Sequence, residues 1–139
     1  MLNRIAFNWK AQTAHGLHSP FVYDLYTQVI DPIYQQKPMD LIESMIHGIG
    51  RHLQLAAGKL HVIDFRKLRE AELAQIEEIM SDPSNLLICT YIHHSKETLQ
   101  NWSFLASKQQ AIHSIELIEM GIISLNPTAP KQYFRLKKS

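Results

Sequence analysis

The sequence predicts an α/β protein: a partial Rossmann-like, mixed sheet with a C-terminal antiparallel hairpin and an N-terminal helical arm. The first observation is an alternation of short apolar segments with segments at helical spacing. It gives a strand at 60–65, a helix at 70–80, a strand at 86–92 and a helix at 96–107. The second is a run of strands at the C-terminal end, at 113–118, 121–125 and 132–136, the first two joined tightly. Parallel strand–helix units followed by a hairpin are typical of an α/β sheet with an antiparallel edge.

The region before residue 60 is predicted to be helical. Its first helix carries apolar residues at helical spacing: Leu2, Ile5, Ala6 and Trp9. Ser19 and Pro20 start a second helix, because serine caps exposed amides and proline at the first helical position loses no hydrogen bond. The pair at 31–32, Asp-Pro, is expected to end it.

A third helix is expected over residues 40–55, closed by a glycine at the end of the run 56–58. The chain shows no repeats or flexible linkers, and its 139 residues suit one domain. We therefore expect residues 1–139 to form a single domain, with a helical arm over 1–58 and a half-Rossmann α/β unit over 59–139.

Charge and cysteine content narrow the function classes. The chain has 14 Lys and Arg against 13 Asp and Glu, so it has no broad positive field for nucleic acid. Cys89 lies in an apolar run and is expected to be a buried thiol, and one cysteine cannot form an internal disulfide. The first ten residues lack a signal-peptide core, and no stretch is apolar enough for a membrane span. We expect a cytoplasmic protein with no membrane partner.

Two segments resemble a known family. The first, at residues 15–23, contains an N-terminal signature: His15, His18, Ser19, Pro20 and Phe21. The second runs from residue 60 to the C-terminus and includes the hairpin at 118–123 and the closing residues 133–136. Both resemble class I S-adenosylmethionine-dependent methyltransferases, in particular a bacterial family related to small-molecule O-methyltransferases.

The resemblance implies that the cofactor-binding half is missing. A full member of the family has further strand–helix units at this point, each about 30 residues long, or roughly 90 residues for three. Only the connection at 55–59 is available here. Gly48 and Gly50 lie at the end of a predicted helix, which is the wrong context for a nucleotide-binding turn. We therefore expect no cofactor.

The resemblance also places a candidate pocket at two strand ends. Asp64 matches the family's aspartate that often serves the metal and the acceptor. At the end of the next strand, Thr90 and Tyr91 stand where the family has a pair of aspartates. Magnesium prefers several oxygen ligands, so metal-assisted catalysis is not expected. His93 and His94 complete the candidate pocket, yet adjacent residues of an extended segment point to opposite sides. We assign no catalytic residue and no metal site.

The leading interpretation is a non-catalytic methyltransferase-like protein, a pseudoenzyme that acts through protein–protein contacts. The alternative is a residual methyltransferase or small-ligand-binding protein that uses the pocket around Asp64 and Tyr91. Without the missing half, the strand from His61 to Asp64 becomes a sheet edge that invites pairing. We expect either the N-terminal arm or a second copy to cover it, and the partner to be a homodimer mate or a full-length methyltransferase relative.

Overall fold

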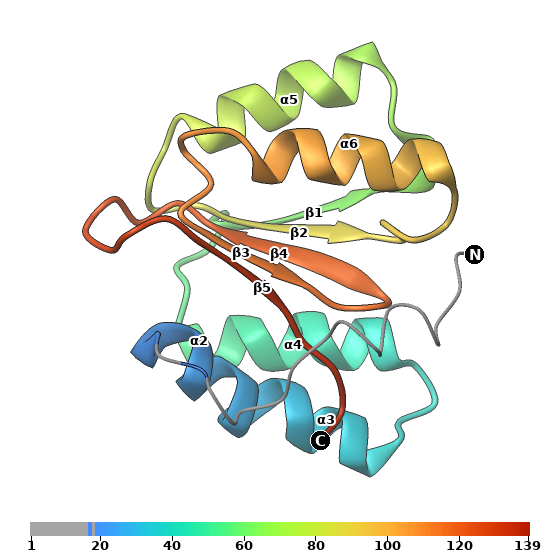
Figure 1. Ribbon diagram of the computed structural model, residues 1–139, viewed down its shortest axis with the longest axis vertical. Coiled ribbons are helices and arrows are strands. Elements are labelled where there is room, and N and C mark those ends of the chain that lie inside the picture. Colours follow the sequence, from blue (N-terminus) through green and yellow to red (C-terminus); the bar gives the residue numbers. More distant parts are fainter. Residues whose placement is uncertain (1–16, 18) are drawn as a thin grey trace.

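The computed structural model describes residue 17 and residues 19–139, which form three layers with one sheet in the middle. Two helices cover one face of the sheet: α5 (Glu70–Met80) and α6 (Lys96–Ala106). Three helices cover the other: α2 (Pro20–Leu25), α3 (Asp31–Gln36) and α4 (Leu41–Leu53) (Figure 1). None of the described helices has the length and apolar character needed to cross a membrane.

The sheet has five strands in the order β1-β2-β4-β3-β5. They are β1 (Leu60–Asp64), β2 (Leu86–Thr90), β3 (His113–Glu116), β4 (Met120–Ser124) and β5 (Gln132–Arg135). β1 is parallel to β2 and β5 to β3, while β4 is antiparallel to both of its neighbours. The predicted partial Rossmann-like sheet and its antiparallel hairpin are therefore confirmed, and the hairpin turn lies at 117–119.

The start of α2 follows the sequence prediction, but its end does not. Ser19 caps the helix by accepting a hydrogen bond from the Val22 N–H at 3.3 Å. The expected break at the Asp31–Pro32 pair is wrong, because the chain passes through a π-helical segment, Tyr26–Ile30, directly into α3. The wider π turn changes the i→i−4 pattern with which a proline ring would clash, so Pro32 is accommodated in the first turn of α3.

α4 is shorter than predicted and ends without a glycine. Asp40 caps it by accepting from the Glu43 N–H at 3.0 Å, and Gln54 closes it in the left-handed conformation with φ of 51°. The two glycines of the 48–50 pattern lie inside this helix, so they form no nucleotide-binding turn. Gly48 allows a close helix contact, since a Cβ there would stand 2.9 Å from the Ile33 side chain.

The strands place two separate cores on the two faces of the sheet. In β2, Leu86 and Ile88 belong to the core with α2–α4, whereas Leu87 and Cys89 belong to the core with α5 and α6. Cys89 has no exposed surface, and burial raises the pKa of its thiol. The prediction of a buried thiol is confirmed.

Trp102 of α6 packs directly on the backbone of β4 at Gly121. A Cβ at this position would lie 2.2 Å from the indole ring, closer than any side-chain contact allows. The indole itself is fully buried, and its Nε1 donates a hydrogen bond to the Tyr133 hydroxyl at 2.8 Å. Gly121 thereby sets the height of α6 above the sheet.

We expect Gly121→Ala to destabilise the fold, because the added methyl group must displace a buried indole. Overpacking of this kind costs about 1–3 kcal/mol, and loss of the Trp102 hydrogen bond adds to it. Urea unfolding followed by circular dichroism measures the change. Gly50→Ala is the matched control: its Cβ would lie 3.4 Å from Leu60, an ordinary contact, and alanine favours the helix. Equal stability of the two variants would contradict this account.

Candidate functional site

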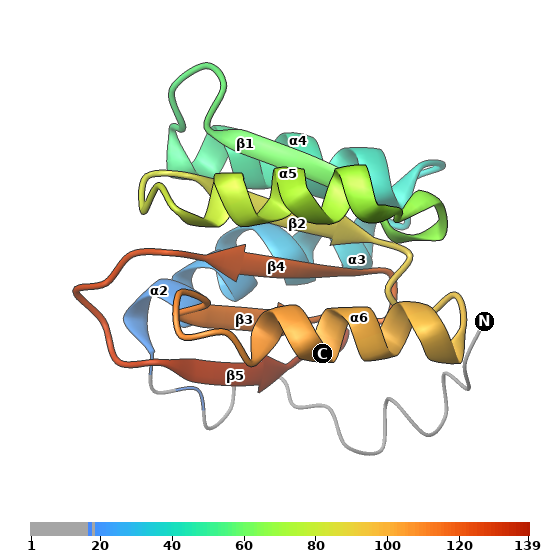
Figure 2. The ribbon, with the colours of Figure 1, turned by 90° about the horizontal axis from the view of Figure 1, so that it is seen from above.

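Four of the five strands end at one edge of the sheet, which we call the carboxyl edge. The last residues of β1, β2, β3 and β5 are Asp64, Thr90, Glu116 and Arg135. β4 runs in the opposite direction, as Figure 2 shows. Open α/β sheets bind ligands outside the carboxyl ends of their strands, so this edge is the place to look for a site.

Asp64, the residue that matches the family's aspartate, is engaged by its own neighbour. One carboxylate oxygen accepts from the Arg66 backbone N–H at 2.9 Å and from Nε at 3.1 Å, and the other accepts from Nη2 at 2.8 Å. The hydrogen bonds from Arg66 hold the pKa of Asp64 below its ordinary value. The carboxylate therefore caps the short 3-10 helix Phe65–Lys67, and both of its oxygens are already used.

Tyr91 lies against the same arginine. The Arg66 guanidinium carbon is 3.5 Å from the centre of the Tyr91 ring, in a cation–π contact. Tyr91 has a φ of 60°, and its N–H donates to the Glu119 carbonyl at 3.1 Å. Thr90 turns inward, where its hydroxyl donates to the Ile63 carbonyl at 3.4 Å. The structure therefore gathers Asp64, Thr90 and Tyr91, but Arg66 occupies the space between two of them.

The two histidines of the candidate pocket diverge. The His93 side chain is buried, and its Nε2 lies 2.8 Å from a carboxylate oxygen of Glu116. His94 is exposed. One histidine is therefore buried and the other exposed, but residues 91–94 form a turn and not the extended segment on which the expectation of opposite directions rested. Over residue 17 and residues 19–139, no three His, Cys, Asp or Glu side chains group closely enough to hold a metal ion.

Glu116 is the centre of a buried polar network that the sequence did not reveal. Its side chain is 3% exposed, and its Oε2 contacts His93. Its Oε1 accepts from the Tyr133 hydroxyl and from the Arg135 Nε at 3.2 Å. The network continues to Trp102, whose indole N–H donates to the Tyr133 hydroxyl at 2.8 Å. A signal was present: an acidic residue within the apolar segment 113–118 must be partnered if that strand is buried.

The environment of Glu116 keeps it ionised. Burial alone raises the pKa of a carboxyl group, but the hydrogen bonds from His93 and Tyr133 and the charge of Arg135 outweigh it and lower the pKa. Conversely, burial and the Glu116 hydrogen bond raise the pKa of the Tyr133 hydroxyl. The network therefore consists of a carboxylate with several donors and a neutral phenol, a structural arrangement rather than an acid–base pair near neutral pH.

The N-terminal signature splits between described and undescribed residues. His15 and His18 lie outside the described residues. Ser19 and Phe21 both contact His113 at the start of β3: the serine Oγ is 3.5 Å from Nε2, and the two rings stack with centres 5.0 Å apart. This part of the signature attaches the first described helix to the sheet.

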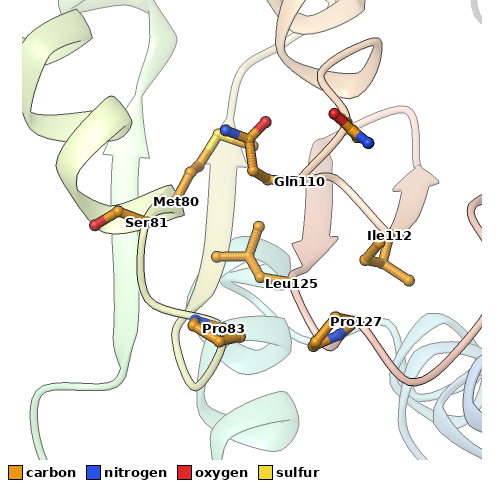
Figure 3. Close-up of a pocket in the computed structure, with 8 residues that line it drawn as sticks. Met80, Ser81, Pro83, Gln110, Ile112, Leu125 and Pro127 are labelled. Atoms are coloured by element: carbon orange, nitrogen blue, oxygen red, sulfur yellow. The ribbon is translucent and has the colours of Figure 1, made fainter.

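A cavity of about 420 Å³ opens at the opposite edge, where β2 and β3 begin and β4 ends (Figure 3). Its lining carries apolar, amide and hydroxyl groups but no charged side chain: Met80, Ser81, Pro83, Gln109, Gln110, Ile112, Leu125 and Pro127. It has no group suited to general acid or base catalysis near neutral pH. None of the predicted pocket residues lines it.

Comparisons with protein-family models, with curated proteins and with solved structures found no match to this chain.

We expect Glu116→Gln to lower the free energy of unfolding at neutral pH by about 3–5 kcal/mol. The neutral amide cannot replace the buried carboxylate as the shared partner of His93, Tyr133 and Arg135. The folded-state pKa of Glu116 lies below its ordinary value of 4.5, so the carboxylate stabilises the fold above that pH. This contribution is lost as the pH falls below 4.5 through the folded-state pKa. The difference between wild type and variant should therefore shrink on acidification.

Urea unfolding at a series of pH values from neutral to acidic measures this difference. Glu119→Gln is the matched control, since Glu119 is a second glutamate of the same hairpin, and its carboxylate accepts from the Tyr34 hydroxyl instead of joining the buried network. A constant difference between wild type and Glu116→Gln across the pH range would contradict the assignment.

Proposed function

We propose that the chain is a non-catalytic, methyltransferase-like protein that acts through protein contacts and pairs with a second copy of itself along β1. The observation that carries this proposal is the open outer side of β1. β1 is the last strand of the sheet, and β2 is its only partner among the described strands. An edge strand of this kind is a template for pairing with another chain.

The direction of the backbone groups in β1 can be worked out from two contacts. The Lys59 carbonyl accepts from the Leu86 N–H at 2.8 Å, and the Ile63 carbonyl accepts from the Thr90 hydroxyl at 3.4 Å. Backbone groups alternate along a strand, so the odd-numbered residues face β2. The N–H and C=O of Val62 therefore point away from the sheet, as do those of its even-numbered neighbours.

The surroundings of this edge are largely apolar. Val62 is 44% exposed, although it lies in the middle of a strand. A cavity of about 390 Å³ adjoins the start of β1 beside α4; apolar side chains such as Ile46, Leu55 and Leu60 line most of it, together with His47 and Arg51. A partner strand that pairs with β1 would cover both the backbone groups and this apolar surface, which favours association.

Charge does not distinguish the two sheet edges. β5 contains one formal charge, on Arg135, which is paired with Glu116, and β1 contains one, on Asp64, which is paired with Arg66. Three cations flank each strand: Lys59, Arg66 and Lys67 at β1, and Lys131, Lys137 and Lys138 at β5. The proposal of β1 as the pairing edge therefore rests on the apolar surface beside it.

The position of α2 favours a second copy over the N-terminal arm as the cover of β1. Ser19 and Phe21 contact His113 in β3. β2 and β4 lie between β3 and β1 in the sheet. The start of α2 thus lies on the side of the sheet away from the open edge, while α4, the last helix of the arm, adjoins the start of β1 on one face of the sheet.

A two-fold pairing has a natural register. In an antiparallel pair centred on Val62, each Val62 exchanges both backbone hydrogen bonds with its symmetry mate, and Leu60 faces Asp64 of the other copy. Both valine side chains then lie on the α4 side of a continuous sheet. This register uses the outward-pointing backbone groups of β1 on both copies.

The loss of catalysis is supported by how the pocket residues are used. Asp64 and Tyr91 are both occupied by Arg66, and His93 is held by Glu116. The connection from the end of α4 at Leu53 to the start of β1 at Leu60 is too short for a further strand–helix unit. The residues that would serve a methyl donor and its acceptor are thus absent or committed to other contacts.

We expect the wild-type chain to elute as a dimer in size-exclusion chromatography with light scattering at micromolar concentration. Val62→Lys should give monomers, because two ammonium groups would face each other on the symmetry axis. Val62→Pro should do the same, since it removes an outward N–H while the ladder to β2 stays intact. Tyr23→Lys is the control, because Tyr23 is 49% exposed and lies on α2.

A monomeric wild-type protein would overturn the self-association, and pull-down of a full-length methyltransferase through wild-type β1 would then identify a different partner for the same edge. Dissociation by Tyr23→Lys but not by the Val62 variants would place the interface elsewhere. Thermal melts of all variants ensure that a monomer is still folded.

We expect S-adenosylmethionine to leave the melting temperature unchanged, with or without magnesium. A ligand at a hundredfold its dissociation constant would stabilise the fold by about 2.7 kcal/mol, which a thermal shift assay detects easily. Asp64→Asn is the informative control. A saturable shift in wild type that this variant loses would favour the residual methyltransferase or small-ligand function instead.

A further inference from the structure

We infer that α4 makes a second contact in the dimer: it packs antiparallel against α4 of the second copy, and Glu43 of each copy forms an ion pair with Arg51 of the other. The inference rests on the self-association proposed above and names the surface that the second copy contacts beside β1. α4 lies along β1 on one face of the sheet and runs in the opposite direction to it (Figures 1 and 2). The segment 54–59 connects the two elements.

α4 lies beneath the edge strand itself. A Cβ at Gly50 would stand 3.4 Å from the Leu60 side chain, so this part of α4 is in contact with the start of β1. Neighbouring strands are about 4.8 Å apart, whereas packed helices need about 8–10 Å between their axes. Two α4 helices beneath two adjacent β1 strands are therefore in direct contact, with no space for another element between them.

One side of α4 faces the open edge of the sheet. On the opposite side, Gly48 contacts α3, since a Cβ there would stand 2.9 Å from the Ile33 side chain, and α3 lies farther from β1 than α4 does (Figure 2). Two residues along an α-helix correspond to a rotation of about 200°, so Ile46 and Gly50 project away from α3. Both line the cavity of about 390 Å³ beside Leu60. The centre of the surface that a second copy meets is thus apolar.

The two-fold axis of the proposed dimer passes close to Ile46. Gly50 lies level with Leu60, and Val62 lies about 6.6 Å further along the strand, at about 3.3 Å per residue. α4 runs the other way and rises about 1.5 Å per residue, so the residue level with Val62 is about four positions before Gly50. In the register centred on Val62, the Ile46 side chains of the two copies therefore face each other.

Two opposite charges flank this position on the surface of α4. Glu43 and Arg51 are both exposed, and their midpoint in the helix is His47, one residue from Ile46. Two-fold symmetry about this point brings Glu43 of each copy nearly level with Arg51 of the other, and the long side chains cover the small difference. Of the described residues, none forms an ion pair with Glu43. Arg51 contacts the neutral or weakly basic ring of His47, at 3.4 Å, and can bind a carboxylate as well.

The same charges oppose the neighbouring registers of the strand pair. An axis through Leu60 is level with position 50 of α4 and would bring the two Arg51 side chains together. An axis through Asp64 is level with position 42 and would bring the two Glu43 side chains together. Like charges that face each other disfavour both arrangements. α4 thus selects the register centred on Val62.

Charge reversal in two complementary variants of the full chain tests the inference. Glu43→Lys leaves only cations at the two positions and Arg51→Glu only anions, so each homodimer should be roughly tenfold weaker than wild type, as two exposed ion pairs become repulsions. Asp40 binds the Glu43 backbone N–H, so the helix cap is retained. In an equimolar mixture both pairs are attractive, and native mass spectrometry should show the mixed dimer above its statistical proportion. High salt should remove this excess. Glu77→Lys mixed with Lys108→Glu is the matched control, because that pair lies on the other face of the sheet.

A statistical proportion of mixed dimer would overturn the α4 contact, and the pairing of β1 would still stand if wild type is dimeric and Val62→Lys is monomeric. An excess of mixed dimer that Val62→Lys does not weaken would overturn the pairing of β1 instead. An equal excess in the control mixture would show general attraction between oppositely charged chains and overturn the specific ion pairs. A monomeric wild type would overturn both proposals. Thermal melts ensure that all variants are folded.

Discussion

A carboxylate that is almost completely removed from water must find its compensation within the protein, and Glu116 finds it in three residues from two different parts of the chain. His93 comes from the segment after β2, while Tyr133 and Arg135 come from β5. Leaving one such charge without partners would cost several kcal/mol. The network therefore fixes the segment after β2 and the last strand relative to β3, and through the Trp102 hydrogen bond it also fixes α6. Gly121 belongs to this constraint, because only a residue without a side chain leaves room for the indole.

Contacts within the protein also occupy the polar groups of the carboxyl edge. This edge is where ligands bind in open α/β sheets, and polar residues do gather there. However, Glu116 is surrounded by donors from the protein, and Asp64 accepts from Arg66 with both oxygens. Arg66 in turn covers the ring of Tyr91. Groups that could orient a substrate in another protein here stabilise the ends of the strands.

The sequence predicted what depends on local pattern. The period of apolar residues located every strand and the helices α5 and α6 to within two residues, and the Ser19 cap followed from residue type alone. It failed where a distant contact or a rare backbone decided. Pro32 is accommodated by a π turn that no local rule favours, and Gln54 adopts a conformation in which glycine is expected. For the site, it named His93 but not Glu116, because their pairing depends on the register of β3 beside β4, which brings together residues far apart in the chain.

The two edges of the sheet show how the same physical problem has different solutions in one molecule. In β5 the Tyr133 and Arg135 side chains are held by Glu116, so this edge strand is fixed by a buried polar network. β1 has no such network: its central residue is apolar and partly exposed, and the backbone groups of that residue point outward. An unprotected edge that is short and interrupted could be tolerated, but β1 is a regular strand of the same length as β2 with which it pairs throughout. Such an edge is a template for pairing, and in the proposed dimer a second copy supplies by symmetry the same apolar surface and the same outward-pointing backbone groups.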